Sequence, residues 1–337
     1  MRLAWAGAHI KQSRTSSVAL LALAVTVLAS GCTALGSGAS GGSSITVAIV
    51  PGIDNAPLRV AVQDGLFRQD GLNVTIQDYS SLDAEVQAFA RGKVQIAEGD
   101  YTDFFYEQAV GRASLRLIAD AYDATANSVA ILTLPASGIT TPLQLQSQAA
   151  DVATPPAQVA PYSAAVPYNV QTLAAEEVLQ NDGVSPSSVN WTQTQSQDMI
   201  GALRSGRVKA ILATEPYILE AEEQLGAVEV VDASSGVTSG LPMSGYFSLA
   251  SYARANPSAV QAFQRALEQA QADCAQRGPV QSVLSHFTGM TTGDAALVTL
   301  GTYPTSLNVG QVQRVAGLMY DSGMISNPVN VSALAAG

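Results

Sequence analysis

The stretch Ala88-Phe-Ala-Arg-Gly-Lys-Val-Gln95 occurs a second time, with changes, as Ala202-Leu-Arg-Ser-Gly-Arg-Val-Lys209. Each copy has the features of a helix end, a glycine at the C′ position, one basic residue and the start of a strand. A helix that turns directly into a strand is a corner of a βα unit in a mostly parallel sheet. Two such corners, far apart in the chain, predict two similar lobes rather than one large sheet.

Strand-like and helix-like segments alternate on both sides of these corners, which is typical of α/β proteins. The predicted strands are residues 45–50, 72–77, 94–97, 129–132, 151–153, 189–192, 208–213 and 246–250. The predicted helices between them are residues 56–63, 82–90, 169–180 and 197–203, the first of them capped by Asn55. From residue 257 onward only helices are predicted, at 257–277, 279–287 and 310–322. This helical segment therefore has to pack against a lobe that is already formed.

The domain organisation follows from this order of segments. Residues 45–126 are expected to form the first part of lobe one, residues 127–251 lobe two, and residues 252–337 the C-terminal part of lobe one. Each lobe is expected to be a mostly parallel sheet flanked by helices, with the helical C-terminal segment packing back on lobe one. The chain then crosses between the lobes twice, near Asn127 and near Ser251.

The N-terminus has the features of a bacterial lipoprotein signal. Residues 1–31 combine a basic leader with the apolar run 18–29, which is shorter than the about 20 residues that a membrane span needs. Ser30-Gly31-Cys32 is similar to a lipobox, so Cys32 is expected to carry lipid and to anchor the chain on the extracytoplasmic face of the cell membrane. Residues 32–44 form a Gly/Ser-rich tether behind it. The alternative is an ordinary secretory signal with an incidental cysteine.

Charge and cysteine content argue against two classes of function, nucleic-acid binding and catalysis by a cysteine nucleophile. The formal net charge is −11, and removal of the basic leader makes the mature chain more negative. Because lysine and arginine are few and scattered, we expect no nucleic-acid partner. Cys274 lies in a helical segment, where a packed small residue is a better interpretation than a nucleophile.

Four stretches resemble one known family. These are Pro57-Leu-Arg-Val-Ala-Val-Gln-Asp-Gly-Leu-Phe-Arg-Gln-Asp-Gly-Leu-Asn-Val74, the segment 88–100, the segment 202–217 that ends in Glu-Pro-Tyr, and Ala255-Asn-Pro-Ser-Ala-Val-Gln-Ala-Phe263. They are similar to the nitrate/sulfonate/taurine and thiamine-precursor branch of the type II periplasmic-binding-protein fold. The resemblance implies the solute-binding subunit of an ABC import system, acting as a monomer without cofactor or catalysis. Its implied partners are a small-molecule solute and the permease and ATPase subunits.

The sequence departs from that family in lobe two. The usual lysine-containing strand entry is replaced by the segment 142–151, which has no lysine. The usual Gly/Ser-rich loop is replaced by the segment 154–169, which contains several prolines. Since this loop contributes to ligand capture in the family, the class of solute stays open on this evidence.

Ligands of open α/β sheets bind beyond the carboxyl ends of the strands, and this rule selects the candidate ligand-binding residues. They are Asp54, Asn55, Gly99, Asp100, Tyr101 and Tyr122 in lobe one, and Tyr162, Tyr168, Asn169, Glu215 and Tyr217 in lobe two. Tyrosine faces and carboxylates suit a neutral or cationic heteroaromatic solute, such as a pyrimidine precursor of thiamine. A sulfonate or nitrate is the alternative, because helix N-termini at Asn55 and Asn169 could hold an oxyanion.

Two other functions were weighed against solute import. A pyrimidine synthase that uses pyridoxal phosphate shares the fold, but it needs a lysine and histidine chemistry. The mature chain offers only Lys93 and Lys209, both at strand starts, and the single histidine His286, so we expect no enzyme. A sensor lipoprotein without a transport role is the third hypothesis.

Overall fold

The computed structural model describes residues 43–80, 82–156 and 169–335. The predicted signal peptide, Cys32 and most of the tether lie outside the described residues, as do Tyr162 and Tyr168. The compact unit to which the described elements belong spans Ser40–Gly337. None of the helices in the described ranges combines the length and apolar character needed to cross a membrane.

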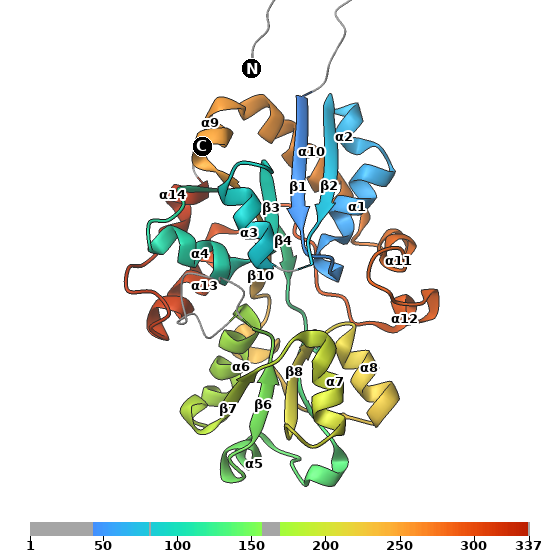
Figure 1. Ribbon diagram of the computed structural model, residues 1–337, viewed down its shortest axis with the longest axis vertical. Helices are drawn as coiled ribbons and strands as arrows, with labels where there is room; N and C mark the ends of the chain where they lie inside the picture. The colour runs from blue at the N-terminus through green and yellow to red at the C-terminus, as the bar shows by residue number, and fades with distance from the viewer. Residues whose placement is uncertain (1–42, 81, 157–168, 336–337) are drawn as a thin grey trace, which may run out of the picture. The chain divides into compact units, whose positions relative to one another are not determined.

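The first sheet has the strand order β2-β1-β3-β10-β4 (Figure 1). Its strands are β1 (Ser43–Ile49), β2 (Leu72–Asp78), β3 (Ile96–Asp100), β4 (Leu115–Asp123) and β10 (Pro242–Leu249). Strands β1, β2 and β3 are parallel, whereas β10 runs antiparallel to β3 and β4. The accompanying helices are η1 (Ile53–Asn55), α1 (Ala56–Gln63), α2 (Leu66–Gln69), α3 (Leu82–Ala90) and α4 (Tyr101–Ala109). Because β1 begins at Ser43, the last two residues of the predicted tether belong to the sheet.

The second sheet has the order β7-β6-β8-β5-β9. Its strands are β5 (Val129–Thr133), β6 (Asp151–Thr154), β7 (Asn190–Gln193), β8 (Ala210–Thr214) and β9 (Val228–Asp232). Its helices are η2 (Pro135–Ser137), α5 (Pro142–Ser147), α6 (Val170–Asn181), η3 (Pro186–Ser188), α7 (Ser196–Arg204) and α8 (Tyr217–Leu225), and η4 (Gly236–Thr238) follows β9. Again one strand, β5, is antiparallel to its neighbours. We call the parts built on the two sheets lobe one and lobe two; the predicted two-sheet α/β fold is confirmed.

The two copies of the repeated stretch have the same geometry. Gly92 and Gly206 adopt φ values of 67° and 71°, which L-residues with a Cβ seldom adopt. After each glycine, a backbone N–H donates back to the helix end at 3.0 Å, from Lys93 to Ala88 and from Arg207 to Ala202. Each corner leads into the central strand of its sheet, β3 or β8. The repeated stretch therefore marks equivalent places in two similar sheets.

The predicted return of the chain near Ser251 is wrong. Strand β10 pairs with β3 and β4, so the chain has already re-entered the first sheet by Pro242. The cause is that β10 is buried along nearly all of its length. A strand that is buried on both faces shows no alternation of polar and apolar residues, so its sequence does not reveal the sheet to which it belongs.

The C-terminal helices pack on lobe one, as predicted. They are α9 (Ala250–Ala255), α10 (Pro257–Asp273), α11 (Arg277–Leu284), α12 (Thr292–Leu297), α13 (Val309–Asp321) and α14 (Val331–Ala335). The ring of Phe263 on α10 stacks on Phe67 with centroids 5.2 Å apart. Gln264 donates from Nε2 to the Ile118 carbonyl of β4 at 2.7 Å. Cys274, at the end of α10, is buried, which confirms its interpretation as a packed residue.

Candidate functional site

The carboxyl ends of β1 and β3 bring together polar side chains that are far apart in the sequence. Asn55 is fully buried, and its Nδ2 donates to the Val50 carbonyl at 2.9 Å and to Glu98 Oε2 at 3.1 Å. Its Oδ1 accepts from the backbone N–H of Gly52. Asn55 stands at the N-cap of α1, as predicted, but its side chain makes no capping hydrogen bond there, because these bonds use both ends of its amide.

Four carboxylates from three segments of lobe one lie close enough for the charge of Asp54 to act on the other three, and we call them the carboxylate cluster: Asp54, Glu85, Glu98 and Asp100. Glu85 and Glu98 are 0% and 2% exposed. Burial raises the pKa of both well above the usual glutamate range, and the neighbouring carboxylates raise both further. Burial also raises the pKa of Asp54. Within the described residues, no lysine or arginine forms an ion pair with any of the four.

Several oxygen atoms of this region have no hydrogen-bond partner among the described residues. Glu98 Oε1 and both Glu85 carboxylate oxygens are in this state, and so are the hydroxyls of Ser244 and Tyr246 on β10. The Ser244 hydroxyl nevertheless lies close enough to Asp54 and Glu98 to lower the pKa of each. Buried polar atoms are normally paired, so these unpaired atoms on α3, β3 and β10 leave capacity for further hydrogen bonds.

Asp100 connects the two lobes. It ends β3 and caps α4, where its Oδ1 accepts from the backbone N–H and the hydroxyl of Thr102 at 2.8 and 2.7 Å. Its Oδ2 accepts from the Val170 N–H of lobe two at 3.2 Å. Burial raises the pKa of Asp100 to about 6, and this effect outweighs the hydrogen bonds from Thr102 and Val170, which lower it.

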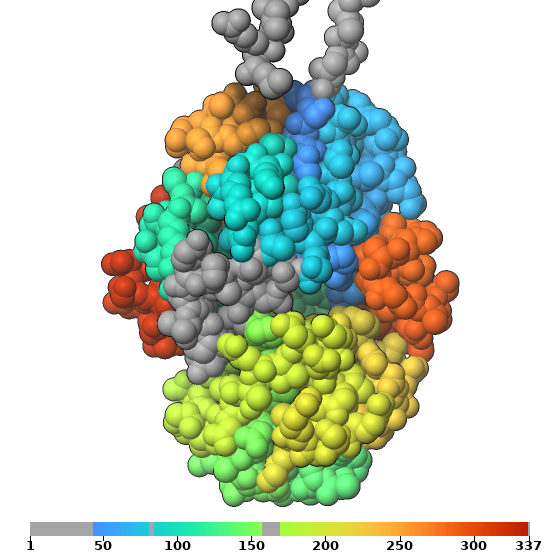
Figure 2. Space-filling model, in the orientation of Figure 1, coloured from blue at the N-terminus to red at the C-terminus, as the bar shows by residue number. Residues whose placement is uncertain are grey.

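Glu215 makes a similar connection from lobe two. It follows β8, and its Oε2 accepts from the Leu219 N–H of α8 at 3.1 Å. Its Oε1 accepts from the Thr299 N–H of lobe one at 2.9 Å. Figure 2 shows the orange α11–α12 segment of lobe one beside the yellow α8 region of lobe two. Both oxygens of this predicted ligand residue are therefore bonded within the protein.

The predicted tyrosines fall into different environments. Tyr122 is 7% exposed, its ring lies 5.4 Å from the ring of Tyr303, and its hydroxyl is bonded to the Gly301 N–H. Burial raises the pKa of both Tyr122 and Tyr303, and the charge of Asp54 adds a smaller effect to each, so this ring pair lies near the carboxylate cluster. Tyr101 is fully buried, and its hydroxyl donates to Asp120 Oδ1 at 2.9 Å. Its ring packs on Phe105 and Phe247, which places Tyr101 in the core of lobe one.

The remaining predicted residues are also spread out. Gly99 lies within β3 and pairs with Gly245 of β10. Asn169 caps α6, with Oδ1 accepting from the Thr172 N–H at 2.8 Å, so its predicted position at a helix start is correct. Tyr217 lines a separate cavity of about 360 Å³ between α8 and the segment 288–294. The structure thus brings together Asp54, Asn55, Asp100 and Tyr122, and leaves Tyr101 and Tyr217 apart from them.

Sequence reasoning missed Glu85, Glu98, Ser244 and Tyr303. Glu98 carried a usable signal, because it is a charged residue inside the apolar strand Ile96–Asp100. Ser244 and Tyr303 carried no such signal in the sequence, because they reach the carboxyl ends of β1 and β3 only when β10 and the C-terminal segment return to lobe one.

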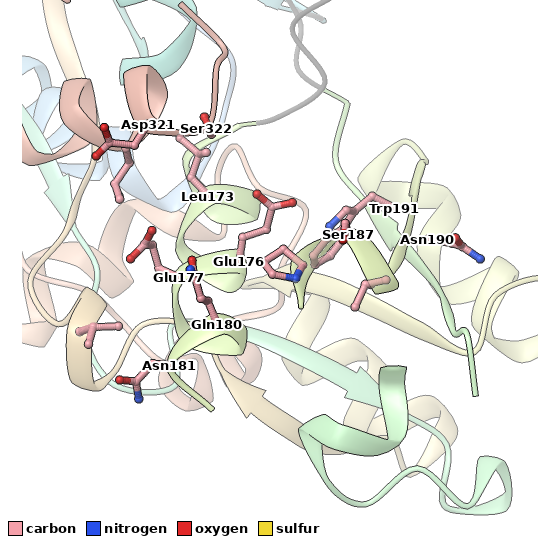
Figure 3. Close-up of a pocket in the computed structure, with 14 residues that line it drawn as sticks. Leu173, Glu176, Glu177, Gln180, Asn181, Ser187, Asn190, Trp191, Asp321 and Ser322 are labelled. Atoms are coloured by element: carbon pink, nitrogen blue, oxygen red, sulfur yellow. The ribbon is translucent and has the colours of Figure 1, made fainter. Parts of the chain in front are cut away.

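A cavity of about 1050 Å³ lies elsewhere on the protein. Figure 3 shows Glu176 and Glu177 of α6, Trp191 of β7 and Asp321 near the end of α13 around it. Burial raises the pKa of Glu176 to about 7. None of the predicted ligand residues that the structure describes lines this cavity. In the described part of the chain, no group of histidine, cysteine and acidic side chains is arranged to hold a metal ion.

Solved structures with the same fold are numerous. The aliphatic sulphonate-binding protein SsuA of Escherichia coli superposes with a TM-score of 0.69 at 17% identity, over 87% of this chain and 97% of that protein. The nitrate-binding protein NrtA of Synechocystis PCC 6803 gives 0.68 at 12% identity, over 87% and 84%. The desulfurization enzyme DSZB gives 0.65 at 16% identity, over 87% and 96%. At these identities the likeness establishes the fold, which binding proteins and an enzyme share.

Comparison with curated protein sequences gave no significant match. The model of the NMT1-like family matches residues 38–284, which include β1 to β10, the whole carboxylate cluster and the first C-terminal helices. This match covers well over half of the chain. The protein therefore belongs to the NMT1-like family.

Proposed function

We propose that this protein is the solute-binding subunit of an ABC import system and that its solute is a heteroaromatic compound carrying a protonated amine or amidine. The observation that carries the proposal is the buried carboxylate cluster without a positive partner. It lies at the carboxyl edge of β1 and β3, where α/β proteins bind their ligands. Asp100 and Glu215, which bond across the lobes, each stand at the carboxyl end of the central strand of their own sheet, β3 or β8.

The electrostatics of the carboxylate cluster favours a solute that carries a positively charged group. Burial is the main cause of the raised pKa values of Glu98 and Glu85, and the charges of neighbouring carboxylates add to it, because buried carboxylates cannot all ionise without a compensating charge. A solute that brings positive charge would lower these pKa values and form charge-assisted hydrogen bonds with Glu98 and Asp54. The unpaired oxygens of Glu98 and Ser244 would then find donors.

The aromatic part of the proposal rests on the ring pair Tyr122–Tyr303. Both hydroxyls are already bonded, with Tyr303 donating to the Ile53 carbonyl at 2.8 Å, so the rings are held in place. Fixed tyrosine rings beside carboxylates suit a flat ring with a positive edge.

Thermal-shift and calorimetric titrations with defined solutes test this function. The panel contains aminomethylpyrimidines and thiamine as cationic rings, uracil as a neutral ring, and an alkanesulfonate and nitrate as anions. We expect saturable stabilisation by a cationic ring and, in the Glu98→Gln variant, at least tenfold weaker binding. Glu268→Gln, the same change at an exposed position of α10, is the matched control and should bind like the wild type.

An anion-binding function is the second candidate, because two of the structural neighbours are named as sulphonate- and nitrate-binding proteins. Stabilisation by the sulfonate or nitrate alone would overturn the cationic proposal and favour this one.

We also propose that the protein catalyses nothing and works at the membrane as a lipid-anchored monomer. Lys93 and Lys209 are both exposed at the two repeated corners, which does not suit a Schiff-base lysine. Burial raises the pKa of the Cys274 thiol to about 12, which does not suit a nucleophile.

Labelling of the wild type but not of Cys32→Ser by radioactive palmitate would support the lipid anchor. Loss of solute uptake in a deletion strain would distinguish import from sensing.

A further inference from the structure

One carboxylate, that of Asp100, lies between the starts of two helices from different lobes. Its Oδ1 accepts from Thr102 at the start of α4, and its Oδ2 accepts from the first N–H of α6, that of Val170. Helix α4 has 9 residues and α6 has 12. Both helix N-termini carry partial positive charge, so together they form a place for an anion.

We propose that Asp100 is a specificity-determining residue: its carboxylate occupies the anion position between α4 and α6, and so excludes sulfonate- and nitrate-like solutes from the closed protein. The inference deepens the proposed function and rests on it for the cationic solute. The exclusion itself depends only on the contacts of Asp100.

Hydrogen-bond donors beside Asp100 are already bonded within the protein, so they are not free to bind a second anion. The Thr102 N–H and hydroxyl are both directed to Asp100 Oδ1. The Thr172 N–H, two residues into α6, is bonded to the side chain of Asn169, and the Leu173 N–H is bonded to the Asn169 carbonyl. An oxyanion that entered would have to displace Asp100 and would meet the buried carboxylates Glu98 and Asp54.

The same contacts explain how a cation-binding protein could still close. In an anion-binding protein, the solute itself can connect helix starts of opposite lobes. Here a residue of lobe one provides that connection, and the solute is left to neutralise the carboxylate cluster.

The test replaces Asp100 and offers an anion from outside. Purified wild type, Asp100→Ala and Asp100→Asn are titrated at pH 7 with sodium methanesulfonate, against sodium chloride at the same ionic strength. Thermal shift measures binding, and the radius of gyration from small-angle X-ray scattering measures closure. The control is Asp198→Ala, which removes the same charge from the exposed first turn of α7.

We expect Asp100→Ala to bind methanesulfonate about 10- to 100-fold more tightly than the wild type, as one charge-assisted anion position becomes free. Its radius of gyration should increase without methanesulfonate and return towards the wild-type value with it. Asp100→Asn, which keeps the volume but not the charge, should show a smaller gain, and Asp198→Ala none.

Equal methanesulfonate affinity of wild type and Asp100→Ala would overturn the inference. If Asp100→Ala fails to fold, the comparison of Asp100→Asn with the wild type decides it in the same way. Failure of the proposed function would instead appear as absent binding of cationic rings by the wild type, a result that leaves the methanesulfonate comparison intact.

Discussion

Lobe one and lobe two share a strand order but differ in what their central strands present at the carboxyl end. In the two sheets the pairs Val47–Ile96 and Val152–Ala210 are equivalent, since each joins the central strand of its sheet to the parallel strand beside it, β1 or β6. Two residues further along, lobe one has Glu98 and lobe two has Leu212, both buried. The arrangement of strands is thus repeated in the two lobes, whereas a buried carboxyl group is present at only one of the two equivalent positions. This difference supports the proposal that lobe one would recognise the solute chemically and lobe two would cover it.

The largest expected effect comes from giving lobe two the residue of lobe one. Leu212→Glu should lower the free energy of unfolding by roughly 3–5 kcal/mol, because it buries a carboxyl group among apolar neighbours without a partner. Urea denaturation measures the change, with Leu212→Met as the control for altered shape. A loss below about 1 kcal/mol would mean that both lobes tolerate a buried charge at this position.

The reverse substitution should have the opposite sign. Glu98→Leu removes a buried carboxyl group that has no positive partner, and the solute-free protein should gain about 1–4 kcal/mol of stability. The same variant should lose the binding of cationic rings. Denaturation with and without solute separates the two effects. A destabilised Glu98→Leu protein would show that Glu98 is structural and would remove the contrast between the lobes.

Acid should stabilise the solute-free protein. The pKa of Asp100 is about 6 and that of Asp123 about 7, both above the unfolded value of 3.8. The folded state therefore binds more protons than the unfolded state. This contribution is fully present below about pH 4 and is lost as the pH rises through 6 to 7, by about 1 kcal/mol per pH unit. Melting temperatures between pH 5 and pH 8 measure it, and a flat profile would contradict the raised pKa values.

The smallest expected effect compares the repeated corners. Gly92→Ala and Gly206→Ala should each cost about 1 kcal/mol, because both positions have positive φ and open space around the missing Cβ. Similar losses in urea denaturation, within about 0.5 kcal/mol, would support equivalent corners. Gly201→Ala, inside α7 and also in open space, should not destabilise the protein. Clearly unequal losses at the two corners would weaken the comparison of the lobes.

Local signals in the sequence were sufficient for most elements but not for the site. The strand Leu72–Asp78 and the helix Leu82–Ala90 follow from periodicity and glycine stops. Tyr101 was mistaken for a ligand residue, because its position after β3 says nothing about the direction of its ring. Strand β4 and the return of β10 depend on pairing between distant segments. The carboxylate cluster depends on the same pairing, so only Asp54 and Asp100 were identified.

The position of β10 also affects the order in which the chain can fold. Lobe two is built from one continuous segment, β5 to β9, and can complete its sheet as soon as that segment is available. Lobe one cannot, because β10 lies between β3 and β4 and follows the whole of lobe two in the chain. Until β10 arrives, β3 and β4 expose unpaired edges of the kind that favour aggregation. A protein exported in an unfolded state would therefore need protection of its first half for longer than of its second.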